Sequence, residues 1–352
     1  MTNPIQTTEK PFINALKGKT HTNPPMWLMR QAGRYLEEYM AIRRSVSGFL
    51  ELCYTPELAH EVTMQPIRRF GFDAAILFSD ILVVPDALGQ EVTFVQGEGP
   101  KLKPVRSAAE LANFNEAWLH QRLEPVYETI RRIRKDLDET YPDTALIGFA
   151  GAPWTVATYV VEGGSSKDFA NTKSWAYQDP QGFQKLIDIL TSSTTDYLLA
   201  QIENGVEAVQ IFDSWSGVLA ESEFRKFCLE PAKKITQAIK EKYPDIPVIG
   251  FPRGAGLMYP NYVEETGVDC VGLDTTVPTG WTKENLADKV CVQGNLDPQI
   301  LLAGGEELDK AVKNILADLS GQPFVFNLGH GIIKETPVSH VERLVDLVRG
   351  RV

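Results

Sequence analysis

The chain has 352 residues, of which 43% are hydrophobic and 23% are charged, a composition typical of globular proteins with a large apolar core. Its formal net charge of −11 at pH 7 and its pI near 5.1 disfavour binding to nucleic acid and to anionic membrane surfaces. A small anionic ligand would therefore need a local cluster of arginines within an acidic protein.

Short apolar runs rich in β-branched and aromatic residues recur along the chain, separated mostly by longer segments with helical periodicity. The eight runs are residues 26–29, 74–78, 145–149, 208–212, 246–250, 270–273, 290–293 and 323–326. The helical segments are clearest at residues 56–70, 123–140, 180–204, 221–242, 306–319 and 337–348. Because the runs are apolar on both faces, the alternation predicts an α/β fold, a single (β/α)8 TIM barrel with buried parallel strands.

Residues 91–106 interrupt this alternation. Val92 and Phe94 alternate with polar residues, and the chain then turns through residues 97–100, Gly-Glu-Gly-Pro. This pattern predicts a β-hairpin excursion after the second strand. No linker or repeat divides the chain, so we expect one domain over residues 1–352.

In such barrels the loops that follow the strands converge on one mouth, where the chemistry takes place. Arg30 and Arg34 follow the first predicted strand and flank Ala32 and Gly33, and Arg43 lies farther on. If this segment turns helically, both guanidiniums point one way, and the glycine lets backbone N–H groups approach the same anion. The alternative is a set of structural salt bridges to nearby glutamates, namely Glu37, Glu38 and Glu57.

Four further polar side chains follow other strands. Asp80 is a lone carboxylate among apolar residues, which either caps a turn or accepts hydrogen bonds from the N–H groups of a ligand. Tyr159 is a core or a site residue, and Ser214 follows the fourth strand. His330 stands between two glycines after the eighth strand. At this position a site role and a structural role are about equally expected.

The sequence lacks the usual cofactor signatures. There is no complete dinucleotide fingerprint, phosphate-binding loop, helical zinc-protease motif or nucleophile elbow. We therefore expect neither a metal nor an organic cofactor.

The cysteines are scattered, without C-x-x-C spacing, which indicates a reducing compartment rather than a disulfide framework. They are Cys53, Cys228, Cys270 and Cys291. Residues 1–19 are polar and contain no run of signal-peptide or membrane-spanning length. We expect a cytoplasmic protein that binds no membrane.

Four motifs, in order, resemble the uroporphyrinogen decarboxylase family, and the resemblance spans nearly the whole chain. They are PMWLMRQAGRYL at residues 25–36, FSDIL at 78–82, GFAGAPWT at 148–155 and NLGHG at 327–331. One departure is visible, because Glu37 stands where the family usually has a proline.

The resemblance implies a cofactor-free TIM barrel, commonly a homodimer, that converts uroporphyrinogen III to coproporphyrinogen III by turning four acetate side chains into methyl groups. Arg30 and Arg34 would then pair with substrate carboxylates, while Gln31, Ala32 and Gly33 present backbone groups.

The same resemblance implies that Arg43 lies near the substrate and that Asp80 binds the central pyrrole N–H groups. Tyr159, Ser214 and His330 would line the cleft. The candidates for catalysis are Asp80, Arg30, Tyr159 and His330.

Two other functions remain alternatives. A methyltransferase of the same superfamily would need a zinc site with a short His-x-Cys step, but Gly331 and Ile332 follow His330. A non-catalytic tetrapyrrole carrier would bind the porphyrinogen and release no product.

Overall fold

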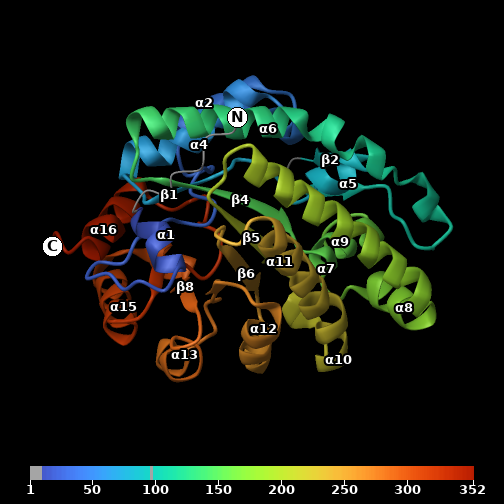
Figure 1. Cartoon of the computed structure of the whole chain (residues 1–352). Coiled ribbons are helices and arrows are strands. Elements are labelled where there is room, and N and C mark those ends of the chain that lie inside the picture. Colours follow the sequence, from blue (N-terminus) through green and yellow to red (C-terminus); the bar gives the residue numbers. More distant parts are fainter. Residues whose placement is uncertain (1–9, 96–97) are drawn as a thin grey trace.

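The structure, a computed structural model, describes residues 10–95 and 98–352. Residues 1–9 of the polar N-terminal stretch and Gly97 of the expected hairpin turn lie outside the described residues. A seven-stranded parallel sheet in the order β1-β4-β5-β6-β7-β8-β9 forms the centre, and helices surround it (Figure 1). Its strands are β1 (Ala74–Ile76), β4 (Ala145–Gly151), β5 (Ala208–Asp213), β6 (Val248–Pro252), β7 (Cys270–Gly272), β8 (Cys291–Leu296) and β9 (Phe324–Leu328).

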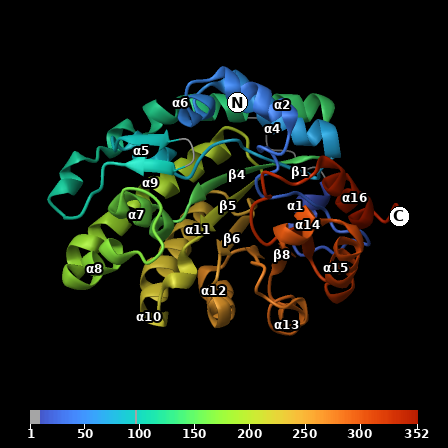
Figure 2. The same ribbon diagram turned by 180° about the vertical axis from the view of Figure 1, so that it is seen from behind.

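The helices form an outer layer that both views show around the sheet (Figures 1 and 2). In the first half of the chain they are α1 (Pro11–Leu16), α2 (Glu37–Ser45), α3 (Phe49–Cys53), α4 (Pro56–Phe70), α5 (Val83–Ala87), α6 (Leu119–Thr140), α7 (Pro153–Glu162) and α8 (Ala170–Gln178). They continue with α9 (Pro180–Glu203), α10 (Glu221–Phe224), α11 (Glu230–Lys242), α12 (Tyr259–Thr266), α13 (Thr279–Asn285), α14 (Pro298–Ala303), α15 (Gly305–Asp318) and α16 (Val338–Val348). No described helix has the length and apolar character needed to cross a membrane.

The predicted strands from 74–78 onward and the predicted helical segments are confirmed to within a few residues at most ends. The segment 221–242 differs, because a π-helical turn at Arg225–Leu229 separates α10 from α11. Short 3-10 turns occur at Glu110–Asn113, Glu116–Trp118, Ser216–Val218 and Gly256–Met258.

A separate antiparallel pair follows α5. β2 (Val92–Val95) and β3 (Gly99–Leu102) pair with Val92 opposite Leu102. β3 also contacts the segment after α7, because the Leu102 N–H donates to the Gly163 carbonyl (3.0 Å) and Lys101 bridges Gly164. The two strands therefore lie against the polypeptide that follows α7.

The predicted first strand, residues 26–29, forms only a single parallel bridge, from Met26 to Phe326 of β9. Met26 also contacts the opposite edge of the sheet. Its carbonyl accepts from the Asp73 N–H (3.0 Å), and its own N–H donates to the Asp73 carboxylate (2.7 Å). One residue thus links β9 to the residue just before β1, so the sheet is curled and its two edges face the same segment.

The prediction of a strand in this segment was wrong because amide side chains replace backbone partners there. Buried Gln31 accepts from the Leu28 N–H and donates to the carbonyl of Ala74 in β1, both at 3.1 Å. Asn327 of β9 accepts from the Met29 N–H at 3.0 Å. The backbone groups are satisfied without the ladder that defines a strand.

α1 covers the amino ends of the strands. Phe12 and Leu16 belong to one buried cluster with the first residues of several strands. Those strand residues are Ala74, Ala145, Ala208, Cys270 and Cys291. The opposite, carboxyl ends of the strands are left for a site.

A buried ion-pair network holds α1 at this end. The Lys10 ammonium is 3% exposed and lies 2.8 Å from the Glu207 carboxylate. Glu207 also pairs with Arg134 of α6 and accepts from the Leu146 N–H (3.0 Å). Burial lowers the pKa of Lys10, and the nearby Glu207 charge opposes that shift. The network therefore depends on Glu207 as the shared counter-charge.

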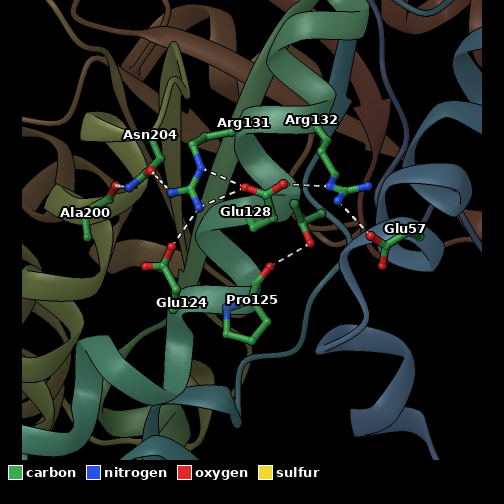
Figure 3. Close-up of polar contacts among 9 residues, drawn as sticks. Glu57, Glu124, Pro125, Glu128, Arg131, Arg132, Ala200 and Asn204 are labelled. Carbon is green, nitrogen blue, oxygen red and sulfur yellow. Dashed lines mark hydrogen bonds and ion pairs between the residues drawn. The ribbon is translucent and has the colours of Figure 1, made fainter.

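A second network lies on the outer surface of α6 (Figure 3). Arg131 donates to Glu128 and to Asn204 at the end of α9, while Arg132 pairs with Glu128 and with Glu57 of α4. These side chains are largely exposed, so each ion pair contributes about 0–1 kcal/mol. Together they join α6 to the helices on either side.

We expect Glu207→Gln to lower the free energy of unfolding by about 3–5 kcal/mol, because it leaves Lys10 and Arg134 without their shared counter-charge in the interior. Glu203→Gln is the matched control, since Glu203 pairs with Lys242 on the surface and its loss should cost about 0–1 kcal/mol. Urea unfolding followed by tryptophan fluorescence measures both. Equal losses would show that the buried network contributes no more than a surface pair.

Candidate active site

The loops at the carboxyl ends of the strands contact one another around a rim. A Cβ on Gly217, after β5, would lie 2.6 Å from the carbonyl oxygen of Gly254, after β6. The Gly254 N–H donates to the Asp274 carboxylate after β7 (2.7 Å). A Cβ on Gly329, after β9, would lie 2.9 Å from the Asp274 carbonyl carbon. Close backbone approach at two glycines thus fixes the loops after four strands against one another.

Arg30 extends this rim with a left-handed backbone, φ 62°, which costs a non-glycine residue about 1–2 kcal/mol. Among the residues that the structure describes, the other non-glycine residue with a positive φ is Phe169. The Arg30 side chain lies over Gly331, where an added Cβ would come within 2.4 Å of the Arg30 Cδ. A glycine at position 331 is therefore needed for this path of the arginine.

The Arg30 guanidinium is a common neighbour of the other predicted catalytic side chains. Burial raises the pKa of Asp80 to about 6, and the Leu82 N–H and the Arg30 charge oppose that rise. Burial lowers the pKa of His330 to about 4, and the Arg30 charge lowers it further. Burial also raises the pKa of Tyr159, again with the Arg30 charge acting in the opposite direction. The structure thus brings Arg30, Asp80, Tyr159 and His330 together.

The structure shows one of the two roles that the sequence context of Asp80 left open. One carboxylate oxygen accepts from the Leu82 N–H (2.9 Å) and so stabilises the turn into α5. The other carboxylate oxygen makes no hydrogen bond to a described residue and is available to a ligand. With a pKa of about 6, the half-buried carboxyl is mostly ionised at pH 7.

His330 is a different kind of group at neutral pH. It is half-buried, and its pKa of about 4 keeps the imidazole uncharged. It therefore offers one N–H donor and one nitrogen acceptor rather than a second cation beside Arg30.

Tyr159 and Ser214 belong to the α7 and β5 side of the mouth. The Tyr159 ring centroid lies 6.5 Å from that of Trp215, the residue after Ser214. Thr155 of α7 donates to the buried Asp213 carboxylate (2.6 Å) and accepts from the Trp215 N–H (3.1 Å). These two bonds fix the loop that carries half-buried Ser214.

Arg34 and Arg43 lie close to Tyr39 of α2. Burial raises the pKa of Tyr39, and the charges of Arg43 and Arg34 both oppose that shift, so all three side chains are close. Neither arginine makes an ion pair or hydrogen bond with a described residue. The arginines on the outside of α6 are, in contrast, paired with glutamates (Figure 3).

Of the three glutamates that the sequence offered as partners for these arginines, two are paired elsewhere, and the third, Glu37, forms no ion pair with a described residue. Glu38 pairs with Arg69 (2.8 Å), and Glu57 pairs with Arg132 (2.7 Å). The arginines after the first segment are therefore free to bind an external anion.

The residues between Arg30 and Arg34 divide into two kinds. The Gln31 N–H donates to the Leu28 carbonyl (2.9 Å), and the Gln31 carbonyl accepts from the Tyr35 hydroxyl (2.8 Å). Gln31 is thus committed to the fold. The N–H groups of Ala32 and Gly33 donate to no acceptor within residues 10–95 and 98–352, which leaves them for a ligand.

Arg253, directly after β6, also lies near His330, although the sequence did not single it out. It is half-buried and forms no ion pair with any part of the chain that the structure describes. Its charge adds to that of Arg30 in lowering the pKa of His330. The sequence could have indicated Arg253 by the same feature as Arg30, because both arginines follow a predicted strand. Over the described residues, no cluster of three or more His, Cys, Asp or Glu side chains is arranged to hold a metal ion.

Comparison with known proteins gives a consistent family. The sequence profile of the family described as uroporphyrinogen decarboxylase (URO-D) matches residues 7–351. A uroporphyrinogen decarboxylase of Rhodospirillum rubrum is 57% identical over 343 residues, which cover 97% of this chain and 98% of that protein. One from a Chelativorans species is 52% identical over 341 residues, with coverage of 97% and 98%.

Among solved structures, a methyltransferase from Methanosarcina mazei superposes with a TM-score of 0.79 at 20% identity. The match covers 97% of this chain and 98% of that one. A B12-independent methionine synthase from a Shewanella species gives a TM-score of 0.55 at 13% identity and covers 94% of each chain. At these identities the two matches show a shared fold.

We expect Arg30→Met to raise the pKa of both Asp80 and His330, from about 6 and about 4, because the positive charge favours the carboxylate and disfavours the imidazolium. NMR titration of protein labelled at aspartate and histidine measures both shifts. Arg44→Met serves as the control, since exposed Arg44 also lacks an ion pair among the described residues but affects neither group. Unchanged pKa values in the Arg30 variant would place its guanidinium outside the site.

Proposed function

Since the chain belongs to the uroporphyrinogen decarboxylase family, we propose that it decarboxylates uroporphyrinogen in haem biosynthesis, as a carboxy-lyase. The reaction turns the four acetate side chains of uroporphyrinogen III into methyl groups and gives coproporphyrinogen III, without a metal or an organic cofactor. The observation that carries this proposal is the position of the Arg30 guanidinium beside Asp80, Tyr159 and His330.

Substrate binding rests on the unpaired arginines. Uroporphyrinogen carries carboxylates around its rim, and Arg30 and Arg34 bind them without first breaking an ion pair within the protein. A hydrogen bond to a charged group contributes about 1.5–3 kcal/mol, so several of them overcome repulsion by the acidic protein. The free N–H groups of Ala32 and Gly33 add neutral donors, and Arg43 adds a further positive charge nearby.

The reaction needs an electron sink, which the pyrrole ring supplies. A proton adds to a ring carbon, and the ring becomes cationic. The acetate C–C bond then breaks, carbon dioxide leaves, and the bonding electrons neutralise the ring as an exocyclic methylene forms. Protonation of that methylene and loss of the ring proton give the methyl group. Each cycle consumes one proton from solvent.

Asp80 and His330 play different parts in this scheme. The free oxygen of Asp80 accepts from the pyrrole N–H groups and stabilises the cationic ring inside a partly dehydrated site. His330, being neutral, and Tyr159 donate hydrogen bonds to the reacting part of the substrate. Ser214 lines the same cleft. Arg30 is the candidate proton donor, although a guanidinium is a weak acid for anything but a strongly basic carbon.

The proposal extends to architecture and assembly. Because Met26 contacts both edges of the curled sheet, we propose that residues 26–29, although they form no regular strand, close the sheet as a (β/α)8 barrel, with β2 and β3 as a hairpin excursion. The barrel is one domain over residues 1–352. Family membership supports a homodimer in the cytoplasm.

Anaerobic incubation of the protein with uroporphyrinogen III tests the function. We expect the hepta-, hexa-, penta- and tetracarboxylate porphyrinogens to form in succession, without added metal or coenzyme. Products are oxidised to porphyrins and separated by carboxyl number. Unchanged octacarboxylate after prolonged incubation with folded protein would leave the non-catalytic carrier as the better assignment.

Asp80→Asn should lower kcat by at least about 100-fold, because a neutral amide cannot stabilise a cationic ring. The wild-type kcat/KM should fall about tenfold per pH unit below pH 6, since the carboxylate is the active form and its pKa is about 6. Steady-state rates from pH 4.5 to 8 measure both effects. An acid limb of the same slope in the Asp80→Asn variant would assign that limb to another group.

A further inference from the structure

Arg253 occupies a fixed place on the rim. It is the first residue after β6, and its N–H donates to the Asp213 carbonyl at the end of β5 (3.1 Å). Its carbonyl accepts from the Ser216 hydroxyl (2.9 Å) and from the Gly217 N–H (3.1 Å). The backbone of Arg253 is therefore tied to the β5 loop on both sides.

The contact between Gly217 and Gly254 strengthens this arrangement. A Cβ on Gly217 would lie 2.6 Å from the Gly254 carbonyl oxygen, so no larger residue fits without movement. Because Ser214 is on the same loop as Gly217, the contact holds Arg253 on the Ser214 side of the mouth. Arg30, in contrast, approaches from the Gly331 side.

The side chain of Arg253 has no anionic partner. Asp274, the carboxylate in the adjoining loop, is occupied by the Gly254 N–H (2.7 Å), the Tyr259 hydroxyl (3.1 Å) and Thr276. Within the described ranges, Arg253 makes no side-chain hydrogen bond or ion pair. A half-buried guanidinium without a counter-charge is unfavourable until an anion binds it.

Arg30 and Arg253 both lie near His330. Both charges lower the pKa of that imidazole, and so both guanidiniums lie close to it from different loops. One ligand in the mouth can therefore meet positive charge from two different loops. A molecule with carboxylates around its whole rim matches such a pair, whereas a ligand with a single acidic end does not.

We propose that Arg253 is a second carboxylate-binding subsite, held on a different loop from Arg30, that binds an acetate or propionate group of the bound tetrapyrrole other than the group held by Arg30. This inference rests on the proposed function. Arg253 holds the tetrapyrrole while an acetate group of the substrate reacts beside Asp80. Loss of Arg253 therefore weakens binding more than it slows the chemical step.

Binding is measured anaerobically by calorimetric titration with uroporphyrinogen III, in an Asp80→Asn background that slows turnover. We expect Arg253→Gln to raise Kd at least about tenfold, as for one lost charge-assisted contact of about 1.4 kcal/mol. Arg253→Lys should recover part of the affinity because it keeps the charge. Arg44→Gln, the matched control, should leave Kd within about twofold.

Coproporphyrinogen III distinguishes the two sources of the carboxylate, because it retains the propionates and lacks the acetates. The same loss of affinity in Arg253→Gln assigns a propionate, and a loss confined to uroporphyrinogen assigns an acetate. Urea unfolding of the variants establishes that they are folded. A Kd unchanged within twofold in folded Arg253→Gln would overturn the proposal.

The product assay tests the proposed function, and the Kd ratio tests the role of Arg253, so the two can fail independently. If the protein with Asp80 intact yields no lower carboxylate products, the enzyme assignment is wrong, while the ratio of Kd values still decides the role of Arg253. In the active enzyme, Arg253→Gln should raise KM in the same proportion as Kd, with kcat within about threefold of the wild type. A fall confined to kcat would contradict a binding role.

Discussion

The candidate site depends on the backbone of Arg30, which is left-handed and lies against Gly331. That conformation is unfavourable by about 1–2 kcal/mol and persists because neighbouring contacts determine it. Gln31 holds the preceding segment to Ala74 in β1, and Asn327 holds it to β9. The two amides do not need to touch a ligand to matter, because they fix the segment from which the Arg30 guanidinium enters the mouth.

The same positive charge has opposite consequences for its two neighbours. Burial raises the pKa of Asp80 to about 6, and the Arg30 charge limits that rise, so the carboxyl is mostly ionised at pH 7. Burial lowers the pKa of His330 to about 4, and the Arg30 charge lowers it further. The Arg30 charge thus favours both an anionic acceptor and a neutral imidazole. Acidic side chains pair with Arg131 and Arg132 on α6, whereas the arginines of the mouth are left unpaired among the described residues. Within a protein of negative net charge this cluster is a local exception, and it suits the polyanionic substrate of the proposed function.

Much of this arrangement followed from sequence because parallel strands end at a common edge. The rule that chemistry follows the strands selected Arg30, Asp80, Tyr159 and His330, which the structure brings together. It could not show that residues 26–29 lack a ladder, because replacement of backbone partners by Gln31 and Asn327 leaves the apolar pattern unchanged. α7 was missed since Pro153–Glu162 is apolar on nearly all sides and shows little helical contrast. Arg253 was overlooked because no motif surrounds it, although its position after β6 is equivalent to that of Arg30.

If the proposed reaction is correct, the site must treat four acetates of one molecule in the same way. A quarter turn of the tetrapyrrole exchanges one pyrrole for the next and leaves the central N–H groups facing Asp80 almost unchanged. The rim carboxylates, in contrast, move from one arginine to another with each turn. Contacts that recognise charge more than shape tolerate that exchange, and flexible arginines on several loops provide such contacts. The central carboxylate supplies the interaction common to every turn, while Arg30, Arg34 and Arg253 hold whichever carboxylates the turn presents to them.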